Sequence, residues 1–199
     1  MVAHHYEGDD LIIRKVEVGD MGNNVYVLED PDTHEALIVD GCFEAETILS
    51  AVGDARVVGI VQTHGHPDHI QALADLKDKL GVPVHAHPGD DYPVAIENRL
   101  SDGDSVRFGT KEAKALHTPG HTPGGTSFLV GRHLIAGDTL FPGGPGKTNN
   151  KEEFDQIIGS LETKLFTLPD DTPVYPGHGD DTTIGAEKPH LEEWVARGW

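Results

Sequence analysis

The segment of this 199-residue sequence that could do chemistry is Thr63–His69, which reads Thr-His-Gly-His-Pro-Asp-His. It places three imidazoles and one carboxylate within six residues, directly after the apolar run Arg56–Gln62. Protonated imidazoles this close would repel one another, and neutral ones need partners, so a solvated surface loop explains the composition poorly. A divalent cation resolves both problems, because neutral imidazole nitrogens and a carboxylate oxygen suit zinc or iron. The segment therefore predicts a metal site at the end of a strand.

The first half of the chain alternates strands with helices that would position this segment. Arg56–Gln62 is nearly all apolar, which is typical of a strand buried on both faces. His69–Leu80 has apolar residues at helical spacing and is closed by Gly81, which predicts an amphipathic helix. Further strands are expected at Leu11–Val18, Asn24–Glu29, Ala36–Asp40 and Pro83–Ala86, and a helix at Phe43–Val52.

The second half repeats this order. Helices are expected at Lys151–Phe166, capped from Thr148–Asn150, and at Ala186–Arg197. The expected strands are Ser105–Gly109, Lys111–Thr118, Thr126–Val130, His133–Ala136 and Thr172–Tyr175. This pattern predicts an α/β fold, a four-layer αβ/βα sandwich of two mixed sheets with helices outside. We expect one domain over residues 1–199, with a frayed N-terminus at 1–10 and a C-terminal helix within 186–199.

Composition excludes several classes of protein. The charge is 15 basic minus 34 acidic residues, or −19, and such a surface repels nucleic acids and anionic membranes. No apolar run approaches the roughly 18 residues of a membrane span, and the first residues do not form a signal peptide. The single cysteine, Cys42, forbids an intrachain disulfide. We therefore expect a cytoplasmic protein that binds neither nucleic acid nor membrane.

Three later segments also combine histidine or aspartate with glycine. They are Thr118–Gly124 (TPGHTPG), Gly137–Phe141 (GDTLF) and Tyr175–Gly179 (YPGHG). With His64-x-His66-x-Asp68-His69 and the earlier Val-Asp-Gly at 39–41, they resemble in order the motifs of the metallo-β-lactamase fold hydrolases. The resemblance spans roughly residues 11–185.

This resemblance implies a centre with two divalent cations, zinc first, with iron or manganese as alternatives. The implied ligands are His64, His66 and His121 for the first cation, Asp68, His69 and His178 for the second, and Asp138 as the bridge. A bridging carboxylate holds such cations about 3.5–4 Å apart, and water between them becomes a hydroxide nucleophile near neutral pH. Asp68 is expected to orient that metal-bound hydroxide, and Asp40 to support the histidine loop from outside the ligand shell.

The residues after the bridging aspartate separate the branches of the superfamily. Gly146-Lys147-Thr148-Asn149 stands where glyoxalase II enzymes and persulfide dioxygenases carry a Gly-Arg-Thr-Asp-like stretch, and Lys147 is the expected substrate contact. Because 21 residues follow His178, the chain resembles short, single-domain glyoxalase II-like hydrolases. The expected reaction is hydrolysis of a small-molecule acyl thioester of a low-molecular-weight thiol, by a monomer or homodimer.

Two alternative activities stay open. The first is a mononuclear-iron persulfide dioxygenase, a branch that retains the same metal-ligating residues. The second is a lactonase or weak β-lactamase-type hydrolase. All ligand positions are filled, which disfavours a binding module without activity.

Other histidines and the cysteine have plainer interpretations. His85 and His87 are expected to be structural, although a substrate contact is the alternative. His117 could compete with His121 as a ligand. Cys42 is expected to be an inert buried thiol, and His133 a surface residue.

Overall fold

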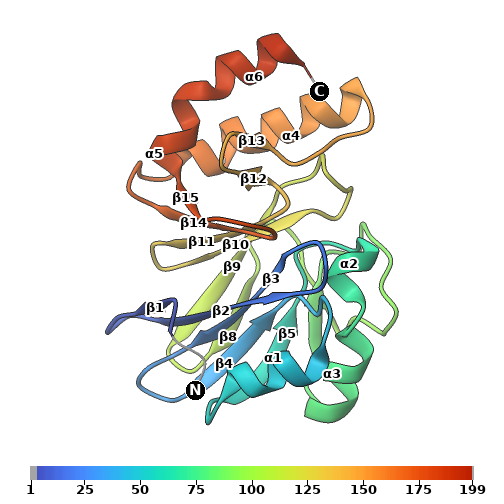
Figure 1. Ribbon diagram of the computed structural model, residues 1–199, viewed down its shortest axis with the longest axis vertical. Helices are drawn as coiled ribbons and strands as arrows, with labels where there is room; N and C mark the ends of the chain where they lie inside the picture. The colour runs from blue at the N-terminus through green and yellow to red at the C-terminus, as the bar shows by residue number, and fades with distance from the viewer. Residues whose placement is uncertain (1–3, 199) are drawn as a thin grey trace.

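Two β-sheets pack face to face and carry helices on both outer sides in the computed structural model, which describes residues 4–198 (Figure 1). The first sheet has its strands in chain order, antiparallel from β1 to β4 and parallel from β4 to β7. These strands are β1 (Tyr6–Glu7), β2 (Ile12–Val18), β3 (Asn23–Glu29), β4 (Glu35–Val39), β5 (Arg56–Val61), β6 (Val84–Ala86) and β7 (Asn98–Arg99).

The second sheet has the order β15-β14-β11-β10-β9-β8, and its one parallel pair is β11 with β14. Its strands are β8 (Ser105–Phe108), β9 (Lys111–His117), β10 (Thr126–Val130), β11 (His133–Gly137), β14 (Pro173–Pro176) and β15 (Thr182–Thr183). A small hairpin of β12 (Leu140–Phe141) and β13 (Gly144–Pro145) lies between β11 and the next helix in the chain.

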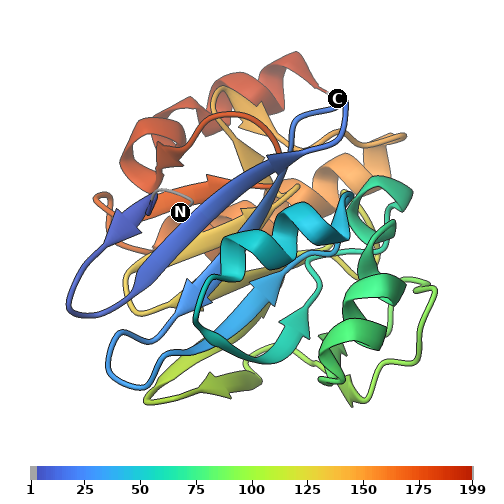
Figure 2. The same cartoon turned by 60° about the horizontal axis from the view of Figure 1, so that its bottom comes forward.

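Helices cover both outer faces. The first sheet carries α1 (Ala45–Val52), α2 (Pro67–Ile70) and α3 (Leu73–Leu80), and α1 lies across β2 and β3 (Figure 2). The second carries α4 (Lys151–Thr163), α5 (Ile184–Glu187) and α6 (Leu191–Arg197), with 3₁₀ turns η1 (Leu165–Thr167) and η2 (Lys188–His190). The Asn150 side chain caps α4 by accepting from Glu153 N at 2.9 Å, within the expected capping segment.

An apolar cluster fills each of the three interfaces between these four layers. One lies between the sheets and includes Leu28, Phe108 and Phe128. A second lies between the first sheet and its helices, and a third, around Ile157 and Trp194, lies between the second sheet and α4 and α6. The predicted four-layer αβ/βα sandwich of two mixed sheets is confirmed.

The helix predicted at His69–Leu80 is divided into α2 and α3. Pro67 starts α2 earlier than predicted, at a position where a missing N–H costs nothing. The break follows because Ala72 N donates to Gly41 O at 2.8 Å and Cys42 O at 3.0 Å instead of continuing the helix. The break separates α2, which bears part of the predicted metal site, from α3.

Both predictions for the chain ends need correction. Within the stretch 1–10 expected to fray, Tyr6 and Glu7 form β1 by pairing with Ile13 and Ile12. The helix expected within 186–199 is interrupted by η2, because Pro189 lacks an N–H and its ring clashes with the preceding turn. Residues 1–3 and 199 lie outside the described part of the chain.

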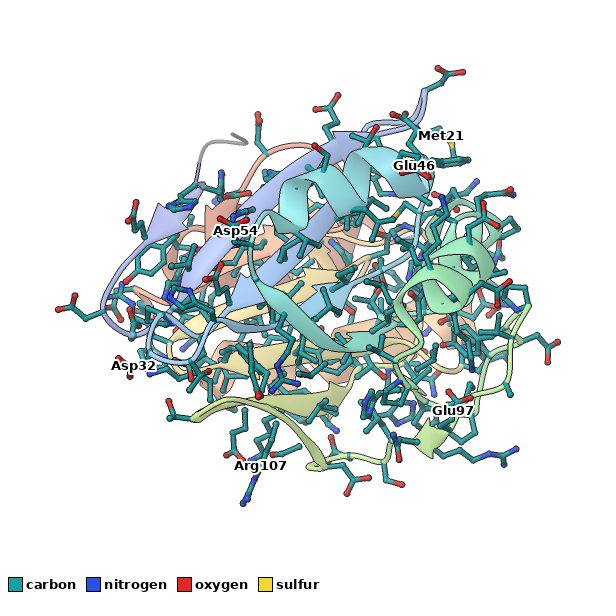
Figure 3. The ribbon with its side chains drawn as sticks, turned by 90° about the horizontal axis from the view of Figure 1, so that it is seen from below. Met21, Asp32, Glu46, Asp54, Glu97 and Arg107 are labelled. Atoms are coloured by element: carbon teal, nitrogen blue, oxygen red, sulfur yellow. The ribbon has the colours of Figure 1, made fainter. Side chains whose placement is uncertain are left out.

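The acidic surplus lies on the surface. Asp32, Glu46 and Glu97 are exposed and project from the molecule (Figure 3). Among the described residues, no helix has the length and apolar content that crossing a bilayer would require.

Candidate metal centre

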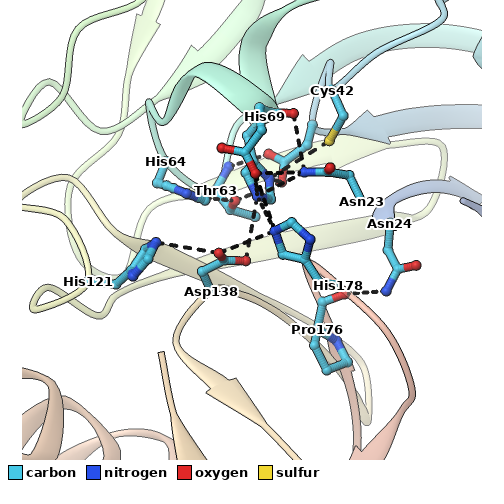
Figure 4. A network of polar contacts seen from close by, with 12 residues as sticks. Asn23, Asn24, Cys42, Thr63, His64, His69, His121, Asp138, Pro176 and His178 are labelled. Atoms are coloured by element: carbon cyan, nitrogen blue, oxygen red, sulfur yellow. Dashed lines mark hydrogen bonds and ion pairs between the residues drawn. The ribbon is translucent and has the colours of Figure 1, made fainter. Parts of the chain in front are cut away.

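The predicted metal-binding residues meet at one edge of the sandwich, where strands of both sheets end (Figure 4). Strand β5 leads to His64 and His66, and α2 carries Asp68 and His69. The second sheet contributes three more side chains through its loops: His121 after β9, Asp138 after β11 and His178 after β14. Packing of the two sheets therefore brings together all seven residues singled out from the sequence.

Three overlapping groups of these side chains could each hold a cation, since the ligand atoms within a group lie within 4.8 Å of one another. They are His64, His66 and His121; His64, His69 and Asp138; and Asp68, His69 and His178. Asp138 Oδ2 lies 3.4 Å from His121 Nε2 and 3.5 Å from His178 Nε2, and Oδ1 lies 3.6 Å from His69 Nε2. Asp138 therefore lies between His121 of the first group and His69 and His178 of the third.

Four of the imidazoles are oriented by a hydrogen bond from the ring nitrogen that faces away from the centre. The Nδ1–H acceptors are Thr63 Oγ1 for His64 (3.0 Å), Asp40 Oδ2 for His69 (3.0 Å), Lys147 O for His121 (2.7 Å) and Met21 O for His178 (3.2 Å). Such partners orient the rings and select the tautomer of the neutral form, in which the Nε2 lone pair faces the centre.

These inward lone pairs test whether a cation fits. His64 Nε2, His121 Nε2 and Asp138 Oδ1 are buried without a hydrogen-bond partner among the described residues. His69 Nε2 and His178 Nε2 lie 3.1 Å apart, within hydrogen-bonding distance, so a proton held between them has to leave before both can bind a cation. Buried acceptors that face one another are costly unless a positive charge lies between them. Imidazole nitrogens with carboxylate oxygens therefore fit divalent cations such as zinc or iron.

The pKa values within the centre follow from burial and from its carboxylates. Burial lowers the pKa of His64 well below the ordinary value, and it lowers that of His66 as well. The hydrogen bond with Asp138 raises the pKa of His178 to about 9. Burial alone would raise the pKa of Asp138, but His178 and the nearby imidazoles hold it below its ordinary value. A cation entering beside His178 must therefore displace a proton, whereas His64 offers a neutral ligand.

Asp40 supports the first histidine loop, as expected. Its carboxylate accepts hydrogen bonds from Thr63 N and Thr63 Oγ1, both at 2.7 Å, in addition to the bond from His69. Cys42 lies beside it, fully buried, with Sγ 3.8 Å from His69 Nδ1, and burial raises the pKa of this thiol well above its ordinary value. A neutral, buried thiol fits the inert role expected for Cys42.

Two amide side chains that sequence reasoning missed also hold the site. Asn23, which is fully buried, donates from Nδ2 to Asp68 Oδ2 at 2.9 Å. Gln62 accepts from Gly41 N at 2.9 Å and donates to His69 O at 3.1 Å. Gln62 could have been noticed as the polar end of an apolar strand. Asn23 could not, because asparagine after glycine is typical of any turn.

Lys147 contacts the centre through its backbone, since its carbonyl accepts from His121. Its side chain is exposed and lines a pocket beside the centre together with Arg197. Gly146 lines this pocket and also packs against the backbone of Asp138 in the centre. A Cβ atom added at Gly146 would lie 1.8 Å from Asp138 O. A substrate contact of the Lys147 side chain stays a prediction.

The other histidines lie outside the three groups of possible ligands in the described chain. The rings of His87 and His117 stack with their centroids 3.9 Å apart, and His117 Nε2 donates to Pro123 O at 2.9 Å. Position therefore favours His121 over His117 as a ligand. The surface location expected for His133 is wrong, because the ring of Tyr6 in β1 covers it at 4.3 Å.

Comparison with known proteins identifies the family. The sequence profile described as the Metallo-beta-lactamase superfamily matches residues 18–178. The chain belongs to this superfamily. A protein of unknown function from Aquifex aeolicus is 39% identical over 89% of this chain and 94% of its own. Hydroxyacylglutathione hydrolase GloC from Haemophilus influenzae is 32% identical over 79% of this chain and 86% of its own.

Solved metallo-β-lactamase superfamily structures share the fold. ETHE1 from Myxococcus xanthus superposes with a TM-score of 0.83 at 32% identity, over 90% of this chain and 83% of that one. The B3 metallo-β-lactamase BLEG-1 gives 0.82 at 29% identity, over 90% and 97%. TTHA1623, solved in a di-iron-bound form, gives 0.75 at 29% identity, over 87% and 96%.

Proposed function

We propose that this member of the superfamily is a binuclear metallo-hydrolase that cleaves acyl thioesters of a low-molecular-weight thiol. The observation that carries the metal chemistry is that His64 Nε2, His121 Nε2 and Asp138 Oδ1 are buried in the centre without a hydrogen-bond partner among the described residues. Similarity to a relative named hydroxyacylglutathione hydrolase supports the thioester as substrate.

We assign two divalent cations to the centre, with zinc as the first choice. The assigned ligands are His64, His66 and His121 for one, Asp68, His69 and His178 for the other, and Asp138 between them. When bound, the cations would act as Lewis acids that polarise the thioester carbonyl and lower the pKa of the attacking water.

Asp68 is the assigned catalytic residue. Its Oδ2 atom lies 3.4 Å from His178 Nε2 and 3.5 Å from His69 Nε2, inside the centre. Asn23 Nδ2 donates to the same oxygen at 2.9 Å, which fixes the orientation of the carboxylate at the centre. A carboxylate oxygen fixed in this way can orient the attacking water and accept its proton.

An iron-dependent persulfide dioxygenase is the second candidate. Its single iron would be held by His64, by His66 or His121, and by Asp138, whose Oδ2 lies 3.4 Å from His121 Nε2. Two imidazoles and one carboxylate are the ligand pattern of many non-haem iron oxygenases. TTHA1623, a similar structure, was solved with two irons, so it supports iron in this fold, whereas the second candidate requires one iron per chain.

Metal analysis and a substrate panel distinguish these functions. Protein purified without added metal is expected to contain about two cations per chain by plasma mass spectrometry. It is then expected to hydrolyse acyl thioesters faster than lactones or β-lactams. One iron per chain, with oxygen uptake on a thiol persulfide and no thioester hydrolysis, would overturn the proposal and establish the second candidate.

The Lys147 side chain is tested by a variant. Lys147→Ala is expected to raise KM for an anionic thioester about tenfold and to leave kcat within about twofold, because the lost contact is made equally before and during the reaction. Steady-state kinetics with a charged and a neutral thioester measure the effect. Lys151→Ala, which removes an exposed lysine paired with Asp155 on α4, serves as the control. Equal KM values in the two variants would remove the Lys147 side chain from the substrate site.

A further inference from the structure

The Asp90 carboxylate joins the two loops that carry the first group of histidines. It lies in the segment after β6, outside every motif singled out from the sequence. Asp90 Oδ2 accepts from Gly65 N at 2.9 Å and from Thr122 Oγ1 at 2.7 Å, and Oδ1 accepts from Gly124 N at 2.8 Å. Gly65 stands between His64 and His66, whereas Thr122 and Gly124 flank His121 on its C-terminal side.

Two glycines of the motifs make this contact possible. A Cβ atom added at Gly65 would lie 2.8 Å from Asp90 Cβ, and one added at Gly124 would lie 2.7 Å from Asp90 Cγ. Both distances are shorter than side-chain atoms tolerate. The glycines therefore allow the Asp90 segment to approach both loops closely.

The hydrogen bonds of Asp90 connect the two histidine-bearing loops to each other. Among the described residues, Asp90 forms no ion pair with a lysine, arginine or histidine, and its three donors all belong to these loops. Hydrogen bonds to a carboxylate are about twice as strong as neutral ones. One side chain thus fixes the distance between a loop of the first sheet and a loop of the second.

We infer that Asp90 is a positioning residue that holds His64 and His66 in register with His121, and thereby sets the affinity of the cation site they form. The inference rests on the proposed metal centre but not on the thioester as substrate. Partners that orient metal ligands from outside typically contribute about 10–100-fold to metal affinity.

Asp90→Asn tests this role in the metal-loaded protein. The N–H₂ group of the new amide must point either at Gly124 N or at Gly65 N and Thr122 Oγ1, all of which donate to the carboxylate in the wild type. We expect one of two bound zinc ions to dissociate about 10–100-fold more readily in competition with a chelator, and the other to be retained as in the wild type. The absorption spectrum of the cobalt-substituted protein should change for one ion only. Asp91→Asn is the matched control, since it removes the same charge from the neighbouring exposed residue.

Thr122→Val removes one of the three hydrogen bonds and keeps the shape of the side chain. It is expected to lower the affinity for the same ion by a smaller factor. The proposal therefore stays testable if Asp90→Asn does not fold. If Asp90→Asn binds both ions with wild-type affinity, or if its affinity for both ions falls equally, the role of Asp90 is overturned. This conclusion does not depend on the hydrolytic activity of the variant. A wild-type protein that binds no cation would overturn it as well. Two bound cations without thioester hydrolysis would instead contradict the proposed reaction and leave the test of Asp90 intact.

Discussion

Replacing His121 by alanine is expected to lower kcat/KM for a thioester by at least about a thousandfold, the equivalent of roughly 4 kcal/mol of transition-state stabilisation. The reason is that His121 Nε2 is buried, has no hydrogen-bond partner among residues 4–198, and lies 3.4 Å from Asp138 Oδ2. Its loss removes one of three assigned ligands of the first cation. The variant should therefore also bind about one metal ion instead of two, which plasma mass spectrometry after dialysis measures.

His117→Ala is the matched control for this variant. His117 is four residues away and was the competing candidate from the sequence, but its ring stacks on His87 outside the groups of possible ligands. The control should keep both metal ions and most of the activity. If His117→Ala were inactive and His121→Ala active, the assignment of the first cation site would be wrong.

Asp40→Asn is expected to weaken the second cation site about 10–100-fold and to destabilise the metal-free protein by about 2 kcal/mol. Asp40 has a φ of 66°, which asparagine tolerates, so the substitution changes the chemistry and spares the backbone. If Oδ1 still accepts from Thr63 N, the new amide N–H₂ faces His69 Nδ1, which must then act as an acceptor. The ring proton moves to Nε2, and His69 no longer offers a lone pair to the centre.

Chelator competition and denaturant unfolding measure the two effects of Asp40→Asn separately. Asp30→Asn provides the comparison, because Asp30 is also buried but lies at the other end of β3 from Asn23, where it accepts from Thr110 N at 2.7 Å. We expect Asp30→Asn to lose stability and keep its metal affinity. If the two variants bind metal equally well, Asp40 contributes only to stability.

The elements of the fold were accessible from the sequence where burial acts along one segment. The apolar run before Gln62 is typical of a buried strand, and the apolar spacing that ends at Leu80 is typical of a helix that packs on a sheet. The interruption of the helix near Ala72 and the short strand at Tyr6 could not be predicted from the sequence. Ala72 N donates to carbonyls some thirty residues earlier in the chain instead of continuing the helix, and Tyr6 pairs with Ile13 while its ring covers His133. Contacts between distant residues leave no local pattern.

The candidate site also has features that the sequence predicts and features that only the tertiary structure shows. The residue types of the first histidine loop predict a metal site by themselves, because three imidazoles and a carboxylate on one short loop suit a cation, whereas the other ligands and their grouping were implied by the resemblance of the later motifs. What only the tertiary structure decided is how these ligands are held: Asn23 on Asp68, the Lys147 carbonyl on His121, and Asp90 between two loops. The physical reason is that an oriented hydrogen bond depends on where two backbones meet. An asparagine or aspartate in a turn looks the same in sequence whether its partner is water or a loop of the opposite sheet.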